Sequence, residues 1–517
     1  MTALLERNDI ERFRSFVVQR LGLLFDDSKL DALAEVLRQQ MEGSGCSSAR
    51  LYLQRLSAST QEIRALAERL TVCETYFFRY EGHFRALAEV VIPRLRARDQ
   101  RRQLRVLSAG CASGEEAYSL AILLRNELPD LAFWDISIRG IDVNVSMLAK
   151  ASRARYNAWA LRDTSAELRA MYFRKEGAEF ILDRTVQSMA SFEERNLIED
   201  DSGFWQSDAF DVVFCRNVTM YLTFETTRSV IARIAQSLTP GGFLFMGHAE
   251  TLRGLSQDFH LLHTHEAFYY QRRDSFAAKD NGPSLLRPKR KVESVAYPPA
   301  SAAHDNSWFD VINQATERIT RLTNGKRGAV VEVPQSAARQ SASPASQPAE
   351  IWDRTDAVEL LRKERFADAI ELLHGLPPGT QADPDAQLLL AALLTNRGEL
   401  AEAEKVCRRL LLLDELNAGA HYLIALSREH ANDMAAAVEH DQAAVYLDSV
   451  FAMPHLHLGL MAKRSGDAEK ARQELNLALA LLVREDASRV LLFGGGFSRE
   501  ALSQFCQAEL AAWGSSQ

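Results

Sequence analysis

A short stretch of small and acidic residues, 108 to 116, has the residue types best suited to holding a ligand. Ser108 to Gly114 carry no bulky side chain, so a ligand can approach the backbone N–H groups that open the next helix. Glu115 and Glu116 follow in the expected first helical turn, where the helix dipole favours negative charge. The two carboxylates would repel a phosphate and attract a cationic amino group. Neither of the phosphate-binding motifs GxxxxGKS/T and GxGxxG is present. An ordinary strand-to-helix connection without a ligand also fits this stretch.

Two further apolar runs end in polar residues that could meet the same ligand. The first, 136 to 141, ends at Asp142, about where a second βα unit places an acidic residue that accepts hydrogen bonds from a ribose. The second, 210 to 215, runs into Arg216 and Asn217. Ligands of an open α/β sheet bind where the strands end. A nucleoside bearing a charged amino acid, without phosphate, fits this combination, and S-adenosylmethionine is such a molecule.

Composition limits the remaining function classes. The chain has 517 residues, of which 47% are hydrophobic, so we expect several domains with real cores. A net charge of -8 argues against a general nucleic-acid binder. The six cysteines form no CxxC pair, which favours free thiols in a reducing compartment and no metal site. No signal peptide and no apolar run of about 18 residues is visible. We therefore expect a cytoplasmic protein without direct membrane insertion.

The segment 73 to 84, CETYFFRYEGHF, joins the predicted catalytic region to a helical N-terminal domain. Ile10, Phe13 and Val17 recur at helical spacing within residues 1 to about 90. A core helix would explain the aromatic residues of the joining segment. Arg79 is harder to place in a core, because a guanidinium keeps its charge and needs a partner. We therefore predict that Arg79 holds a carboxylate.

Six motifs in one order carry a family resemblance. The chain resembles the chemoreceptor glutamate methyltransferases of the CheR family from residue 1 to about 272. The motifs are TYFFR at 75 to 79, SAGCASGEEAYS at 108 to 119, GIDVN at 140 to 144, RNL at 195 to 197, FDVVFCRNVTMY at 210 to 221 and GGFLFMGHAE at 241 to 250.

The resemblance implies a Rossmann-like (class I) α/β methyltransferase domain with an all-α N-terminal domain. It implies S-adenosylmethionine as the cofactor and, as the substrate, glutamate side chains on the cytoplasmic coiled coil of methyl-accepting chemotaxis proteins. The cytoplasmic enzyme could then be recruited to membrane receptor arrays. By motif position, the expected cofactor contacts are Thr75, Arg79, Glu115 or Glu116, Asp142, Asn196, Leu197, Arg216 and Asn217. Tyr221 matches a tyrosine that lines the reaction site.

The residue chemistry agrees with several of these assignments. Asp142 suits the ribose, Glu115 suits the methionine ammonium, and Asn196 with Leu197 could bracket the adenine. A glutamate carboxylate is already ionised at neutral pH, so the enzyme needs orientation more than a general base. We predict that Arg79 and Tyr221 steer it. The chain departs from the family pattern where Cys73 replaces a common asparagine, Ala117 a common proline and GHAE a usual GHSE.

The second half of the chain has two different compositions. We expect the methyltransferase domain over 91 to 273, with a β-hairpin near 174 to 186. Residues 274 to 351 are rich in Pro, Ser and Ala and predict a linker. From 352 to 517 the sequence is helical and repetitive.

A 34-residue period runs through this last part. Gly398, Asn432 and Gly466 share the interval, as do Ala403, Ala437 and Ala471. The period resembles tetratricopeptide (TPR) repeats, with units beginning near 384, 418 and 452, a divergent unit before them and a capping helix near 498 to 513. Such an array is all-α and binds a protein partner, which the sequence does not identify. His421, Tyr422, His455 and His457 are interpreted as packing or groove residues.

Two function classes remain open on the sequence. The first is an active receptor methyltransferase that the repeats direct or regulate. The second is an interaction scaffold whose methyltransferase domain has decayed. The first class is favoured because a scaffold has no need of all six of the residues Arg79, Glu115, Asp142, Arg216, Asn217 and Tyr221. Methylation of another protein or a small molecule leaves the helical N-terminal domain unexplained.

Overall fold

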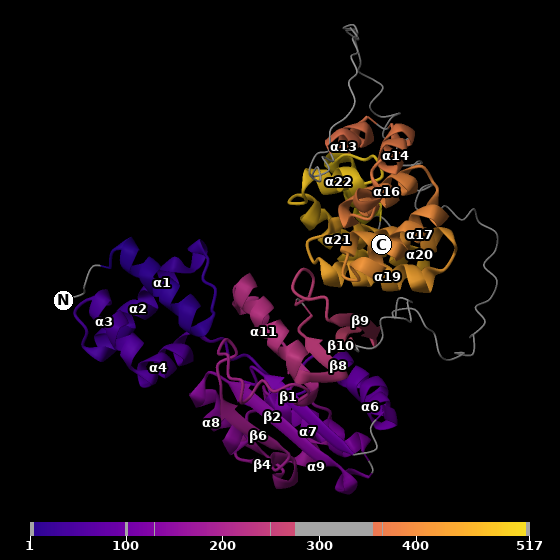
Figure 1. The fold of residues 1–517 in the computed structure, drawn as a ribbon. Helices are drawn as coiled ribbons and strands as arrows, with labels where there is room; N and C mark the ends of the chain where they lie inside the picture. The colour runs from indigo at the N-terminus through magenta and orange to yellow at the C-terminus, as the bar shows by residue number, and fades with distance from the viewer. Residues whose placement is uncertain are drawn as a thin grey trace. The chain divides into compact units, whose positions relative to one another are not determined.

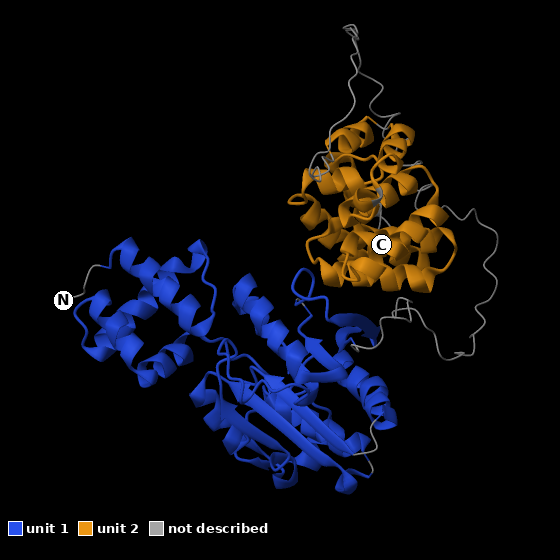
Figure 2. Cartoon of the chain, in the orientation of Figure 1, with its two compact units in different colours: residues 1–285 blue, residues 286–517 orange. Residues whose placement is uncertain are grey.

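The chain forms two compact units, residues 1–285 and 286–517 (Figure 2). The computed structural model describes residues 5–98, 102–128, 130–248, 250–273, 355–363 and 365–512. The predicted linker, 274 to 351, lies outside the described residues. No helix in these ranges is long and apolar enough to cross a membrane.

Four helices form the first part of unit 1 (Figure 1). They are α1 (Arg7–Leu21), α2 (Leu30–Ser44), α3 (Ala49–Ala58) and α4 (Thr60–Leu70), with the short 3-10 helix η1 (Asp27–Lys29) between α1 and α2. Residues at helical spacing, such as Phe13 and Val17, are fully buried in their shared core. Ser48 and Ser59 cap α3 and α4 by accepting backbone N–H groups, as their residue type favours.

A seven-stranded sheet with the strand order β6-β2-β1-β7-β8-β10-β9 forms the centre of unit 1. The strands are β1 (Gln103–Ala109), β2 (Asp135–Asp142), β6 (Ala190–Glu194), β7 (Phe210–Cys215), β8 (Leu238–Met246), β9 (Phe259–Thr264) and β10 (Ala267–Arg272). The first five strands in this order are parallel, and β10 runs antiparallel to both of its neighbours. The predicted α/β fold class is confirmed, and the three expected strands are β1, β2 and β7.

Helices cover this sheet on both sides (Figure 1). The helical elements of this part of the chain are α5 (Glu81–Ala86), η2 (Leu87–Val91), α6 (Ile92–Arg98), α7 (Glu115–Glu127), η3 (Leu131–Phe133), α8 (Val145–Arg153), α9 (Ala166–Tyr172), α10 (Arg184–Gln187), η4 (Thr219–Tyr221) and α11 (Phe224–Ser237). A separate small sheet joins β3 (Arg155–Tyr156), β5 (Glu179–Leu182) and β4 (Phe173–Glu176). Its β4–β5 hairpin turns at Gly177 and Ala178, within the region where the sequence predicts a hairpin.

Unit 2 is a stack of helix pairs with a regular period. Three pairs are α16 (Pro384–Asn396) with α17 (Leu400–Leu413), α18 (Ala418–His430) with α19 (Met434–Leu447), and α20 (Ala452–Ser465) with α21 (Ala468–Leu482). Their first helices start at 384, 418 and 452, which are 34 residues apart. Before them come α13 (Thr355–Arg362), α14 (Phe366–His374) and α15 (Pro378–Gln381), and after them α22 (Ala487–Phe493) and α23 (Arg499–Ala512). The predicted TPR architecture is confirmed.

The period has a backbone cause. Gly398, Asn432 and Gly466 each follow a first helix of a pair and each adopt a positive φ, 79°, 60° and 83°. Glycine and asparagine tolerate this conformation best, so the turn selects them once per repeat. Ala403, Ala437 and Ala471 are fully buried at equivalent positions of the second helices.

The three histidines and the tyrosine interpreted from the sequence as packing or groove residues lie in the packed interior. Tyr422, His421 and His457 are completely buried, and His455 is nearly so. His457 contacts the carboxylates of Asp441 at 2.6 Å and of Glu429 at 3.1 Å. Among the described residues, no group of three or more His, Cys, Asp or Glu side chains could hold a metal ion.

Candidate active site

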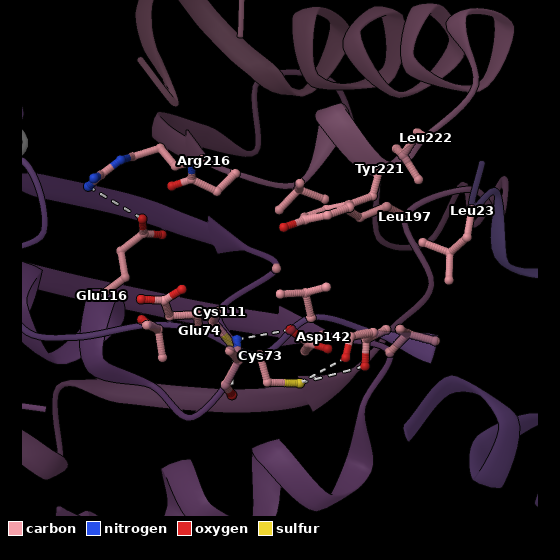
Figure 3. Close-up of a pocket in the computed structure, with 18 of the residues that line it drawn as sticks. Leu23, Cys73, Glu74, Cys111, Glu116, Asp142, Leu197, Arg216, Tyr221 and Leu222 are labelled. Carbon is pink, nitrogen blue, oxygen red and sulfur yellow. Dashed lines mark hydrogen bonds and ion pairs between the residues drawn. The ribbon is translucent and has the colours of Figure 1, made fainter. Parts of the chain in front are cut away.

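One cavity lies at the carboxyl ends of β1, β2, β6 and β7 (Figure 3). Its lining comes from the end of the N-terminal domain, the 70–76 segment and the residues that follow these strands. The lining residues include Leu23, Cys73, Glu74, Thr75, Tyr76, Arg79, Gly110, Ala112, Glu116, Asp142, Arg195, Asn196, Leu197, Arg216, Asn217 and Tyr221. Of the expected site residues, only Glu115 is missing from the cavity wall.

The turn after β1 is fixed to the neighbouring strand. The N–H groups of Gly110 and Cys111 both donate to the carbonyl of Ile141, and that of Ala112 donates to the Asp142 carboxylate at 2.9 Å. Gly110 has a φ of 74°, and a Cβ there would lie 2.3 Å from the Val218 side chain. The small residues of this turn are thus needed both for its backbone conformation and for the close approach of the loop after β7.

Asp142 ends β2 with its carboxylate held from both sides. One oxygen accepts the Ala112 N–H and the other accepts the Asn144 N–H at 2.8 Å. Burial raises the pKa of this carboxyl, and backbone N–H groups oppose the shift. A carboxylate oxygen has two lone-pair directions, so each oxygen keeps acceptor capacity for a ligand. Figure 3 shows Asp142 across the cavity from Tyr221.

The two glutamates that open α7 point to different places. The Glu115 carboxylate accepts from the Ser113 hydroxyl at 2.8 Å and is buried away from the cavity. The Glu116 carboxylate lines the cavity, where it accepts from the Ser108 hydroxyl at 2.7 Å. Burial raises the pKa of both carboxyls. Glu116 is therefore the member of the pair that can meet a cationic ligand group.

Arg216 is a buried cation beside Glu116. Its side chain is 1% exposed, and its Nη1 lies 3.6 Å from a Glu116 carboxylate oxygen. Its Nη2 donates to the backbone carbonyl of Arg79. The Tyr80 and Phe84 rings pack near the guanidinium at 5.4 and 5.7 Å. Among the described residues, Nε and Nη1 have no hydrogen-bond acceptor, so Arg216 retains donors for a ligand or for water.

Arg79 sits in a strained turn. Phe78 and Tyr80, on either side of it, have φ values of 57° and 63°, which bulky residues rarely adopt. Its Nη1 donates to the Glu74 carbonyl at 3.1 Å, and its guanidinium lies 5.6 Å from the Tyr76 ring. Its Nε is buried with no acceptor in the described part of the chain.

The aromatic residues of the joining segment, 73 to 84, would also allow a core helix, but only its last part is helical. Helix α5 begins at Glu81, so the stretch before it is an extended segment and a turn. Phe77 and Phe84 are buried in the core, while Thr75 and Arg79 line the cavity. Phe77 therefore anchors a segment whose Thr75, Tyr76 and Arg79 line the cavity.

Glu250, which has no role assigned on the sequence, organises the loop after β7. Its carboxylate accepts the N–H groups of Asn217, Val218, Met220 and Gly247 at 2.6 to 3.2 Å. It also accepts the Thr219 hydroxyl at 2.8 Å. Asn217 takes a φ of 58° within this arrangement. The buried carboxylate thus fixes the backbone that carries Arg216, Asn217 and Tyr221.

Asn196 and Leu197 follow β6, and Asn196 joins this segment to the N-terminal domain. The Asn196 side-chain amide donates to the Arg20 carbonyl at 2.8 Å, and the Leu197 carbonyl accepts from Arg233 at 2.7 Å. Leu23 pairs with Leu222 as an isolated antiparallel bridge, and the Leu24 N–H donates to the Tyr221 carbonyl at 2.7 Å. The N-terminal domain therefore supplies a wall that the sequence patterns do not indicate.

The residues present fit S-adenosylmethionine. Asp142 offers acceptors for ribose hydroxyls, Glu116 offers a carboxylate for an ammonium group, and Arg216 and Arg79 offer unused donors for carboxylates. Cys73, Glu74, Tyr76 and Arg195 also line the cavity, although no sequence argument singles them out as ligand contacts. Cys73 replaces a common family asparagine, and its Sγ lies 3.4 Å from the Asn144 amide nitrogen.

The sequence of this chain is similar to those of known methyltransferases. Residues 73–268 match the family model described as CheR methyltransferase, SAM binding domain. Chemotaxis protein methyltransferase 2 of Vibrio cholerae is 31% identical over 280 residues, which cover 53% of this chain and 96% of the relative. The proteins named probable biofilm formation methyltransferase WspC from Pseudomonas putida and Pseudomonas aeruginosa are 27% and 25% identical. Each of these two matches spans 90% of this chain and 96% of the relative.

Proposed function

The chain belongs to the CheR methyltransferase family, and from this premise we propose that it methylates glutamate side chains on the cytoplasmic coiled coil of chemoreceptors. It is an S-adenosylmethionine-dependent methyltransferase of chemosensory signalling. The finer assignment, a glutamate methyl ester as the product, rests mainly on one observation. A single cavity is lined by two carboxylates that could hold a cofactor, Asp142 and Glu116, and by two side chains that could orient a carboxylate substrate, Arg79 and Tyr221.

The acidic side would hold the cofactor. S-adenosylmethionine supplies an electrophilic methyl group on a sulfonium sulfur when it is bound. Asp142 would accept hydrogen bonds from the ribose hydroxyls, and Glu116 would pair with the methionine ammonium. Asn196 and Leu197 would bracket the adenine from the segment after β6. Arg216, Asn217 and Thr75 complete the proposed set of contacts.

The basic and phenolic side would orient the substrate. A glutamate carboxylate is ionised at neutral pH and is already a nucleophile, so no base has to remove a proton. Arg79 would hold one carboxylate oxygen through its guanidinium, and Tyr221 would donate its hydroxyl to the carboxylate. Their contribution is orientation and exclusion of water, because tight binding of the ground state alone does not accelerate transfer.

The repeats of unit 2 would serve partner selection. They contain no metal cluster within the described residues and present stacked helix pairs, the architecture of a protein-binding array. The two relatives that match 90% of this chain are named for biofilm formation. That supports a signalling output other than swimming, in a cytoplasmic enzyme that acts on receptors at the membrane.

A transfer assay tests the proposal. Full-length protein is incubated with S-adenosylmethionine labelled in its methyl group and with membranes that contain the cognate chemoreceptor. The expected result is label on the receptor that alkali releases, because methyl esters are base-labile. If the protein binds the cofactor but no receptor is labelled, the scaffold alternative replaces this proposal. Alkali-stable label would indicate a different acceptor group.

A further inference from the structure

Helix α22 lies against the first helices of the repeat array (Figure 1). It packs on α13 and α16, and its Phe493 ring reaches α18. In a superhelical array the first helices of successive pairs line the concave face, which is the usual binding surface. Phe493 covers the part of this face around Gly419 and Tyr422 of α18. Every residue from Ala418 to Ser427 of α18 and from Ala452 to Ala462 of α20 is buried.

Helix α22 departs from the repeat that precedes it. The 34-residue period puts the next first helix at 486, and α22 starts at Ala487. It spans only 7 residues, whereas α18 has 13 and α20 has 14. Gly494, Gly495 and Gly496 end it, the last two with φ values of 61° and 84°. Meanwhile α23 packs on α21 and closes the stack.

Phe493 of α22 fills a pocket made by three helix pairs. A Cβ on Gly419 would lie 2.7 Å from the Phe493 ring and 3.2 Å from Leu388 of α16, so the glycine makes room for the ring. Tyr422 meets Phe493 edge to face, with ring centroids 6.0 Å apart. The ring centroid of Phe451, just before α20, lies 5.0 Å from that of Phe493. Phe493 is 7% exposed.

On the side of α22 that faces the array, a basic residue of the helix meets an acidic residue of the array. Arg489 pairs with the Asp448 carboxylate at 3.1 Å, and its guanidinium lies 4.4 Å from the Phe451 ring. Val490 is buried one helical turn before Phe493, whereas Ala487 and Ser488 are exposed. One face of α22 thus presents a cation and two apolar anchors to the array, and the other faces solvent.

We propose that the concave face of the repeats is a docking site for a short amphipathic helix of a partner protein, and that α22 is an internal occupant which this partner displaces. The partner helix carries an aromatic anchor for the Phe493 pocket, an apolar residue one turn earlier and a basic residue that reaches Asp448. This site is separate from the methyl-transfer chemistry and does not depend on it.

The short length of α22 and the glycines after it are suited to a helix that dissociates from the array. A helix of seven residues is not stable by itself, so its order depends on the groove. The glycines after it allow the chain to change direction, while α23 packs on α21 and is also joined to α20 by an ion pair of Glu509 with Lys463. Because α22 is tethered, its effective concentration at the groove is high, and it would exclude weak ligands.

A peptide with the sequence of residues 484–498 is the probe for this site. It carries a fluorophore and is added in trans to the full-length protein, to F493A and to the control L477A. Leu477 is an exposed apolar residue on α21, so L477A removes apolar volume outside the groove. Because F493A weakens the internal occupant, we expect it to bind the peptide on the order of 100-fold more tightly than wild type and L477A do. The same peptide with alanine at the anchor position should bind none of them.

Equal peptide affinity for wild type and for a folded F493A would overturn the proposal, as would the absence of binding to F493A. A second measurement on the unmodified full-length protein does not depend on the variant. By amide hydrogen exchange, α22 should exchange at least about tenfold faster than α18 and α20, because it opens without the array. Protection of α22 equal to that of α18 and α20 would show a permanent part of the core and contradict the proposal.

Discussion

Replacing Asp142 with asparagine tests the cofactor side of the cavity most sharply. Each carboxylate oxygen of Asp142 already accepts one backbone N–H, at 2.9 Å from Ala112 and 2.8 Å from Asn144. In D142N the new NH₂ group must face one of these two N–H donors. One backbone hydrogen bond is lost, and one of the two acceptors for the ribose disappears.

The expected loss of affinity follows from the ribose contact. A hydrogen bond to a charged acceptor is worth about 1.5–3 kcal/mol. At about 1.4 kcal/mol per tenfold change, the dissociation constant for the cofactor should rise roughly 10- to 150-fold. The fold should survive, because removing a buried charge offsets part of the lost backbone bond, and burial already raises the pKa of this carboxyl.

The assay is calorimetric titration with S-adenosylhomocysteine, which binds without turnover. Asp135 provides the matched control, since it starts the same strand at the other end and its carboxylate accepts from the Gln103 amide at 3.0 Å. D135N should bind like wild type. If D142N also binds within twofold of wild type, Asp142 does not hold the ribose and the proposed orientation of the cofactor is refuted.

Three further predictions follow from other contacts. R79A should lower kcat/KM for receptor methylation by at least about 100-fold with an unchanged melting temperature, because among the described residues the Arg79 guanidinium donates one hydrogen bond, to the Glu74 carbonyl, and contributes little else to the fold. Near-normal turnover would remove Arg79 from the mechanism. E250Q places an NH₂ group against backbone N–H donors, and it should lower the free energy of unfolding in urea by about 3–6 kcal/mol. An unchanged midpoint of the urea transition would contradict the role of Glu250. Burial lowers the pKa of His457, but two neighbouring carboxylates, led by Asp441, outweigh it and raise the pKa to about 9. This stabilisation is complete below pH 6.5 and is lost as pH rises through about 9, so unfolding of the repeats should become easier by about 3 kcal/mol over that window, and H457Q should remove this pH dependence.

Much of the fold is predictable because it repeats simple patterns. The strands ending at Asp142 and Cys215 are apolar runs, and the order of an open α/β sheet brings their carboxyl ends together. The repeat boundaries follow from Gly398, Asn432 and Gly466, since the turn between paired helices needs a positive φ. Local chemistry thus carries enough information for both units.

Individual side-chain directions are not predictable in the same way. Glu115 and Glu116 are adjacent in the sequence, and only the rotation of α7 on the sheet decides that Glu116 enters the cavity. Glu250 is 33 residues from Asn217, so its role depends on tertiary contacts that no local pattern records. In the sequence, Glu250 is marked only by its place at the end of the GHAE motif.

The wall contributed by the N-terminal domain and the placement of α22 escape the sequence for related reasons. Leu23 reaches the cavity through its bridge with Leu222, a pairing of two residues outside any named strand. Helix α22 begins where the period puts a helix, but its three following glycines stop it early and redirect the chain. Both features depend on where a connection leads, which periodicity does not determine.

The most direct test of the central claim is tandem mass spectrometry of the receptor after reaction with full-length protein and S-adenosylmethionine. The account predicts a mass increase of one methylene group on glutamate residues of the receptor's cytoplasmic coiled coil, and its absence in a parallel reaction with R79A. Methylation confined to other residue types, or unmodified receptor under conditions where wild type binds the cofactor, would contradict the assignment of this chain as a receptor glutamate methyltransferase.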